Sequence, residues 1–396
     1  MAEQSVNVNP KLIDWAIERS GRSVETLARG LPWIRRWESS KAHPTLKQLE
    51  TLAKKTWTPL GYFFLSEPPE EKLPVPDFRT ARDEPLRRPS PNLIDTLHTM
   101  QRRQWWMREY LVEMGHEPLA FVGATKLADK VESVAKDIRR TLGMSGGWAR
   151  QIGSWTLALS ALREAAEAAG IFVVINGVVG NDNHRKLDPS EFRGFVLADE
   201  FAPLVFINGA DARSAQMFTL AHELAHLWIG EGGIFDLPDL QADGDRREIF
   251  CNRVAAEFLV PAEELRVFWQ GARHQPESFQ AVAREFKVSP IVAARRVLDL
   301  KLIAREAFFD FYRAYQADER RQAARAKDGG NFYNTQNVRL GKRFARAVAL
   351  GAKEGRLGFR EAYSLTGLQG ATFDKYAKAL IATAVAGKNV VPKFVQ

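Results

Sequence analysis

Apolar residues recur three and four residues apart through most of this chain, which is the period of one face of an α-helix. Short runs of consecutive apolar residues, typical of buried strands, are concentrated between residues 171 and 208. The expected strands are Ile171–Asn176, Gly194–Leu197 and Leu204–Asn208. The longer expected helices are Leu46–Lys55, Asn92–Gly115, Leu127–Leu142, Ser154–Ala169, Asp245–Leu259, Phe279–Phe286, Pro290–Leu298, Leu340–Leu350, Phe359–Leu365 and Thr372–Ala386. The pattern predicts a predominantly helical α+β fold with a small mixed sheet.

A further helical segment, Met217–Leu227, carries a metal-binding pattern, because its apolar stripe contains His-Glu-Leu-Ala-His at residues 222–226. Four residues turn a helix through about 400°, so His222 and His226 lie on one face, where two imidazoles can bind one zinc ion. Glu223 lies beside them and can act as a general base toward a water on the metal. A buried carboxylate among apolar residues is costly without a cation nearby. The pattern therefore favours a metal site over a purely structural helix.

A mononuclear catalytic zinc needs a third protein ligand and an open position. The expected helix Asp245–Leu259 places Glu248 on one face with Asn252 and two alanines, which would allow a close approach to the histidine helix. Glu248 is therefore the expected third ligand, whereas Glu257 points about 180° away. Asn252 could orient a ligand or simply pack between the helices. The weaker alternatives as third ligand are Asp243, Asp245 and His274.

The strand expected at Leu204–Asn208 directly precedes the histidine helix. A turn at Gly209–Asp211 joins the two, with Asp211 as the expected N-cap and Gly230 as the end of the helix. Zinc peptidases use a strand followed by a metal-bearing helix, and a free strand edge can pair with an extended peptide. We therefore expect this strand to offer its edge to a substrate.

The stretch Glu248–Pro261 (EIFCNRVAAEFLVP) lies downstream of the histidine pair. It resembles the second ligand helix of the ImmA/IrrE family of bacterial metallopeptidases, whose pattern is approximately E-x-x-A-N-x-F-A-A-E-L-L-M-P. Cys251 and Val254 replace the alanine and the phenylalanine of that pattern, which alters packing but not the candidate ligands. The resemblance implies a zincin-like fold with Zn2+ as cofactor. The implied metal ligands are His222, His226 and Glu248, and the implied catalytic residue is Glu223.

The resemblance extends toward the N-terminus. Pro44–Lys55, Pro59–Leu65 and Pro76–Arg79 are similar to longer family members that carry an XRE-like helix-turn-helix module. This chain departs from such modules in the short stretch Arg29–Pro32 between the second and third helices, whose proline constrains how the third helix begins. The third helix, around Trp33–Ser39, is then too short to fill a major groove. DNA binding, protein docking and a retained structural scaffold are therefore alternative hypotheses for this module.

These patterns divide the chain into four parts: a helix-turn-helix-like module (1–66), a proline-rich linker (67–92), a zincin-like metallopeptidase domain (93–300) and a helical C-terminal extension (301–396). The extension holds 18 Lys and Arg against 8 Asp and Glu, a net charge of +10. The first 300 residues hold 38 against 40, a net charge of −2. The basic extension suits nucleic acid or an acidic partner, or forms an ordinary solvated helical surface.

Composition excludes several classes of protein. The chain of 396 residues is 45% hydrophobic, which suits a globular protein of two or three domains. It contains no run of about 18 apolar residues and no signal-peptide core, so neither a membrane span nor export is expected. The single cysteine, Cys251, excludes an internal disulfide and suits the cytoplasm.

Two functional hypotheses follow from the resemblance. In the first, the chain is a zinc endopeptidase with a narrow protein substrate, a helix-turn-helix repressor controlled during stress or mobile-element induction. In the second, it is a DNA-binding or toxin-neutralising regulator, with a cognate toxin as partner, whose zincin fold is not catalytic. The first is favoured because all residues that catalysis requires are present. Replacing Glu223 by Gln distinguishes the two, since only the first needs that carboxylate.

Overall fold

The computed structural model describes residues 5–37, 43–71, 89–231, 233–235, 245–317 and 332–387. These fall into two units, each described by itself below. The first comprises Met1–Pro74 with Arg82–His98, and the second comprises Val75–Ala81 with Thr99–Gln396. The four-part division made from the sequence stays a prediction.

The first unit is a small helical bundle. Its elements before the long helix α5 are α1 (Pro10–Arg19), α2 (Val24–Ala28), α3 (Ile34–Trp37), α4 (Leu46–Thr56) and the 3-10 helix η1 (Leu60–Phe64). Thr45 and Gln48 form a reciprocal capping box at the start of α4. The described part of α3 covers only four residues, and residues 38 and 39 of the expected third helix lie outside the described residues.

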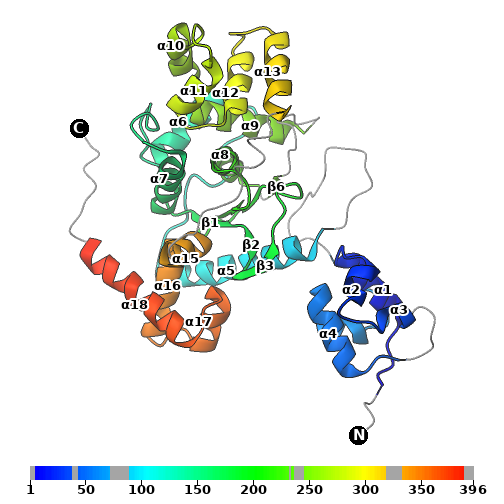
Figure 1. The fold of residues 1–396 in the computed structure, drawn as a ribbon. Coiled ribbons are helices and arrows are strands. Elements are labelled where there is room, and N and C mark those ends of the chain that lie inside the picture. The colour runs from blue at the N-terminus through cyan, green and yellow to red at the C-terminus, as the bar shows by residue number, and fades with distance from the viewer. Residues whose placement is uncertain are drawn as a thin grey trace. The chain divides into compact units, whose positions relative to one another are not determined.

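The second unit contains the sheets and the remaining helices (Figure 1). Its strands are β1 (Phe172–Asn176), β2 (Val178–Val179), β3 (Asp182–Lys186), β4 (Gly194–Leu197), β5 (Leu204–Asn208) and β6 (Gly233–Phe235). Its helices are α5 (Pro91–Glu113, which begins in the first unit), α6 (Val131–Thr141), α7 (Trp155–Ala168), α8 (Arg213–Ile229), α9 (Arg246–Leu259), α10 (Ala262–Ala272), α11 (Ser278–Phe286), α12 (Pro290–Asp299), α13 (Arg305–Ala317), α15 (Phe332–Leu340), α16 (Lys342–Lys353), α17 (Phe359–Thr366) and α18 (Gly370–Gly387). The predicted helical α+β class is confirmed.

The larger sheet has the strand order β1-β5-β4-β6. Strand β5 pairs in parallel with β1 and antiparallel with β4, so both of its edges are used. The expectation that this strand offers a free edge is therefore wrong. The sequence could not reveal it, because pairing partners are set by chain segments outside the strand. Strand β6, paired with β4, is an outer strand of this sheet.

The two faces of the sheet carry different side chains, because successive residues of a strand point to opposite faces. Val173 and Ile175 of β1 and Val205 and Ile207 of β5 join the hydrophobic core that contains α7, α8 and α9. On the other face, Phe172 stacks on Phe344 of α16 at a centroid distance of 4.8 Å. Figure 1 shows α8 between the sheet and helices α10 to α13, with α15, α16 and α17 on the far side of the sheet. The sheet is thus buried on both faces, and α8 packs against it.

Helix α8 begins one residue later than expected and ends at the expected glycine. Its N-cap is Ala212 rather than Asp211, so the predicted cap is wrong. Asp211 instead accepts a hydrogen bond from the Ala212 backbone at 2.8 Å, which places its carboxylate one residue before the capping position. Gly230 ends the helix in the left-handed conformation with φ of 80°, as predicted.

Helix α6 begins at Val131 rather than at Leu127. The intervening residues form a turn in which the Lys126 backbone N–H donates to the Asp129 carboxylate at 2.8 Å and the Asp129 backbone N–H donates to the Lys126 carbonyl. These bonds compete with a first helical turn.

Among the described residues, no helix combines the length and apolar character needed to cross a bilayer.

Candidate metal centre

Helices α8 and α9 pack against each other and bring the three expected ligand side chains together. The Nε2 atom of His222 lies 3.1 Å from Oε2 of Glu248, and Nε2 of His226 lies 3.1 Å from Oε1 of the same carboxylate. The two imidazole Nε2 atoms are 3.0 Å apart. Fully buried Ala255 of α9 lies in the core that the two helices share, as expected for a close approach. Ligands separated by 22 residues in sequence therefore converge on one point.

The spacing of these atoms fits a bound zinc ion. Two ligand atoms on a tetrahedral zinc with bonds of about 2.0–2.1 Å are about 3.3 Å apart, close to the separations found here. His222, His226 and Glu248 form the candidate metal cluster among the described residues. Two imidazole nitrogens and one carboxylate are the donor set of many catalytic zinc sites, which leave a position open. The three residues could therefore hold a metal ion.

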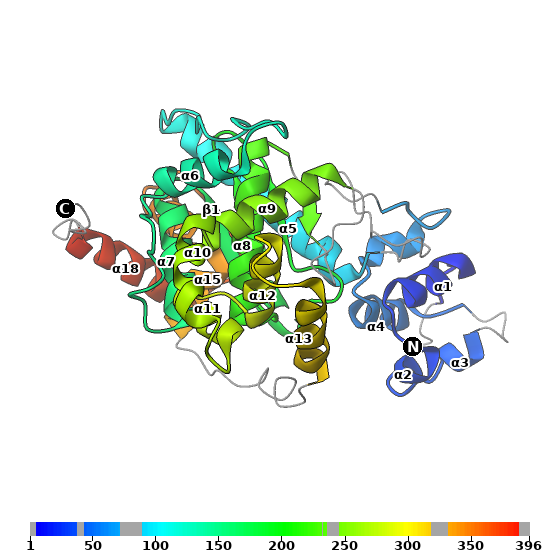
Figure 2. The same cartoon turned by 90° about the horizontal axis from the view of Figure 1, so that it is seen from above.

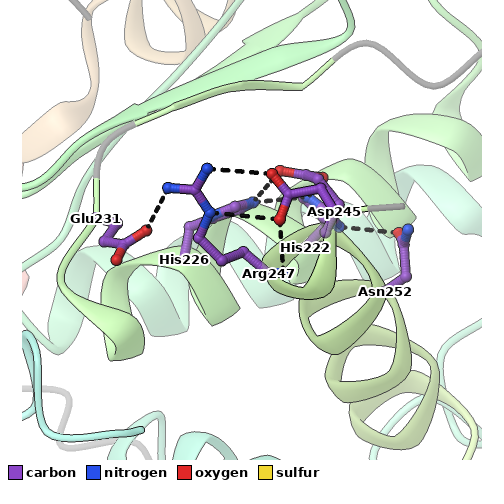
Figure 3. A network of polar contacts seen from close by, with 7 residues as sticks. His222, His226, Glu231, Asp245, Arg247 and Asn252 are labelled. Atoms are coloured by element: carbon purple, nitrogen blue, oxygen red, sulfur yellow. Dashed lines mark hydrogen bonds and ion pairs between the residues drawn. The ribbon is translucent and has the colours of Figure 1, made fainter. Parts of the chain in front are cut away.

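Asn252 fixes how His222 presents its ring. Its Oδ1 atom lies 3.0 Å from Nδ1 of His222 (Figure 3). When the amide oxygen accepts, His222 Nδ1 carries the proton and Nε2 keeps its lone pair for a metal. The sequence left open whether Asn252 orients a ligand or only packs between the helices. Its contact with His222 supports the first role.

The pKa values of His222 and Glu248 are shifted toward the forms of these two groups that bind a metal. Burial lowers the pKa of His222, although the neighbouring Glu248 carboxylate opposes this, so its imidazole is neutral at physiological pH. Burial acts to raise the pKa of Glu248, but contacts with His222 and His226 outweigh it and the pKa lies well below its usual range. Neutral imidazole and ionised carboxylate are the forms that coordinate zinc.

Glu223 is buried beside the cluster without a polar partner among the described residues. Both carboxylate oxygens are buried and have no hydrogen-bond partner among the described residues. Burial, with a smaller contribution from Glu248, raises the pKa of Glu223 well above its usual value. A buried carboxylate without partners is costly, and a nearby cation and its water would remove that cost. This orphaned group is the second observation that fits a metal at this place.

Strand β4 packs very closely against Glu223. A Cβ atom added to Gly194 would lie 2.7 Å from Thr219 Cγ2 and 3.1 Å from Glu223 Oε1. Only glycine lets the strand approach α8 to this distance, because any larger residue would displace the carboxylate or the strand. Gly194 is a site residue that the sequence analysis missed. Its position at the start of an expected strand gave no distinguishing signal.

The other ligand candidates contact different residues or lie outside the described residues. Glu257 forms a buried ion pair with Arg296 and accepts hydrogen bonds from the Ala262 backbone. Asp245 is the N-cap of α9, and the exposed His274 accepts a hydrogen bond from Arg273. None of these three belongs to the cluster. Asp243 lies outside the described residues.

An arginine adjacent to Glu248 ties the ends of the two ligand helices together. Arg247 donates to Glu231, just after α8, at 3.1 Å and to Asp245, the N-cap of α9, at 3.1 Å (Figure 3). The sequence analysis also missed this contact. An arginine beside an N-cap aspartate was visible in the sequence, but its reach to Glu231 depends on the packing of α8 on α9.

Two segments of the chain match known family models. Residues 166–298 match the peptidase M78 model, described as the IrrE N-terminal-like domain, which covers about a third of the chain. Residues 340–379 match a domain of unknown function, DUF8813. Neither segment includes the N-terminal helices, so the helix-turn-helix module stays a prediction. No curated protein matches the chain significantly. The same is true of solved structures. The first match supports a metallopeptidase of the ImmA/IrrE kind and contains every residue of the metal centre.

Proposed function

We propose that this chain is a zinc-dependent endopeptidase that cleaves one specific protein. The observation that carries the proposal is the convergence of His222, His226 and Glu248 next to the buried, unpartnered Glu223. This arrangement lies within the segment similar to the IrrE N-terminal-like domain. A structural site would fill all four positions of a zinc with protein ligands, whereas here the described cluster offers three.

Each residue of the site has a distinct role in the proposed reaction. His222, His226 and Glu248 would hold the zinc, and Asn252 keeps His222 in the correct tautomer. Bound zinc supplies Lewis-acid chemistry, which activates water and polarises a peptide carbonyl. Glu223 accepts the proton of the attacking water on its carboxylate and then passes it to the departing amine.

We further propose that the substrate is a helix-turn-helix repressor and that cleavage relieves repression during stress or mobile-element induction. This part rests on the resemblance to ImmA/IrrE regulators. The basic C-terminal helices and the N-terminal module supply candidate surfaces for DNA or for a partner such as a toxin.

The test compares wild-type protein with Glu223→Gln and His226→Ala variants. Each is loaded with zinc, its metal content is measured, and it is incubated with candidate helix-turn-helix repressors from the same organism. We expect wild type and Glu223→Gln to bind one zinc and His226→Ala to lose it, and only wild type to cleave the repressor. If zinc-loaded wild type leaves every candidate repressor intact while regulation in cells persists in Glu223→Gln, the proposal fails. A non-catalytic regulator is then the correct description.

A further inference from the structure

A cavity of about 780 Å³ adjoins the metal centre within the second unit. Its wall includes neighbours of the candidate ligands on both helices: Phe218 lies one turn before His222 on α8, and Ile249 follows Glu248 on α9. Asn252, which contacts His222, also lines the cavity. A peptide whose scissile bond lies at the metal centre would therefore present a neighbouring side chain to this cavity, since consecutive residues of an extended chain are about 3.3 Å apart.

Three helices present matching stripes to this space. Lining positions recur three, four and seven residues apart, which places them on one face of each helix. The stripes are Ile249, Asn252, Arg253 and Ala256 of α9; Val292, Arg295, Arg296 and Asp299 of α12; and Arg305, Phe308 and Phe309 of α13. Figure 2 shows α12 and α13 side by side, as their helix contacts also indicate. The volume lies within the range of about 300–1,000 Å³ typical of ligand sites.

The charges lining the cavity are only partly compensated. Arg295 is paired with Asp299 at 2.9 Å, and Arg296 is paired with Glu257. Arg253 and Arg305 form no ion pair within the described part of the chain, although the Arg305 guanidinium lies over the Phe309 ring at 5.4 Å. The remaining lining carboxylate is Glu132, at the start of α6. Two uncompensated arginines against one carboxylate leave the mouth of an apolar cavity with a positive excess.

We propose that this cavity is the substrate-selecting pocket of the peptidase and that it accepts a large apolar side chain with an acidic residue next to it. The aromatic and aliphatic lining takes the apolar side chain, and burying it there supplies binding energy. Arg253 and Arg305 pair with the acidic neighbour, and arginine is the residue best suited to bind carboxylate. This inference rests on the proposed function, because it assumes that a peptide occupies the metal centre.

Binding without turnover tests the pocket directly. The probe is a pair of fluorescein-labelled decapeptides that carry phenylalanine followed by glutamate or by lysine in an otherwise neutral sequence. Each is titrated with the full-length, zinc-loaded Glu223→Gln protein, and binding is followed by fluorescence anisotropy. We expect the glutamate peptide to bind about fivefold more tightly, and the preference to shrink with added salt, because both arginines are solvent-accessible.

Charge reversal identifies the residues responsible. The double change Arg253→Glu and Arg305→Glu should abolish or invert the preference, whereas Arg266→Glu, an exposed arginine on α10 away from the cavity, should preserve it. Thermal unfolding of each variant checks that the fold is retained. If the two peptides bind equally, if neither binds at millimolar concentration, or if the double variant keeps the preference, the inference is overturned.

The same measurements separate this inference from the proposed function. If the protein shows the charge-dependent binding but cleaves nothing, the pocket assignment stands and the proposed peptidase activity is wrong. A protein that cleaves its repressor equally well with and without an acidic residue beside the scissile bond remains a peptidase, and the pocket assignment is wrong.

Discussion

The Nδ1 atom of His222 and the Oδ1 atom of Asn252 lie 3.0 Å apart and join α8 to α9 directly behind the metal centre. The two helices that carry the ligands are therefore coupled by a contact that also sets the tautomer of one ligand. Asn252 follows Glu248 by one turn of α9, so one helix face supplies both a candidate ligand and its support.

Removing this contact should weaken zinc binding without unfolding the protein. We expect Asn252→Ala to lower zinc affinity about 10- to 100-fold, as is typical for groups that orient a ligand. Asn252→Asp should restore much of the affinity, because its carboxylate can still accept from His222 Nδ1. Competition with a chromophoric chelator measures both. Equal affinities in wild type and Asn252→Ala would show that the asparagine only packs between the helices.

Glu223 should destabilise the metal-free protein. Since burial raises the pKa of its carboxyl, the folded state holds the proton more tightly than the unfolded state, and stability falls as pH rises above the unfolded value of 4.5. We therefore expect metal-free Glu223→Gln to be more stable than wild type by about 1–3 kcal/mol at neutral pH. Denaturant unfolding measures the difference. Exposed Glu263→Gln is the control and should have no such effect.

Gly194 should tolerate no side chain. An added Cβ would also lie 2.9 Å from the Phe206 carbonyl oxygen, so Gly194→Ala must push β4 away from its neighbours. We expect a loss of about 1–3 kcal/mol in stability together with reduced cleavage, because the same Cβ crowds Glu223. Gly153→Ala is the matched control, since nothing lies within 4 Å of its added Cβ. Comparable thermal unfolding of the two variants would contradict this account.

Glu167 should make the stability of the second unit depend on pH. Burial raises its pKa to about 7, although Arg163, at 3.2 Å, and the Lys342 backbone N–H oppose the shift. The folded state therefore keeps a proton that the unfolded state releases above pH 4.5, so this stabilisation is lost as pH rises through about 7.

The expected consequence is a pH-dependent difference between wild type and Glu167→Gln, which mimics the protonated acid. Relative to wild type, the variant should gain stability between pH 5 and pH 8, by at most about 3 kcal/mol. Thermal unfolding at both pH values measures this gain. Glu164→Gln, whose side chain is 51% exposed beside the same arginine, should show no comparable change. A constant deficit for Glu167→Gln at both pH values would instead mean that the ion pair with Arg163 keeps the carboxylate charged.

Local sequence patterns were sufficient to predict the positions of most helices and strands. The helix period placed the boundaries of α4 and α7 within a few residues, and Gly230 marked the end of α8. The apolar runs located β1, β4 and β5. Such signals act between neighbouring residues, so they are present in the sequence itself.

The sequence by itself determined that His222 and His226 share one face of a helix with Glu223 beside them, because helical geometry alone fixes the relative directions of residues so close in sequence. Helical spacing also favoured Glu248 over Glu257 as the third ligand. Only the tertiary structure brought Glu248 to 3.1 Å from His222, placed Asn252 against the same ring, and set β5 inside the sheet. These relationships join segments distant in sequence. Their distances depend on how α8, α9 and the sheet pack together, and that packing results from the whole core rather than from any local pattern.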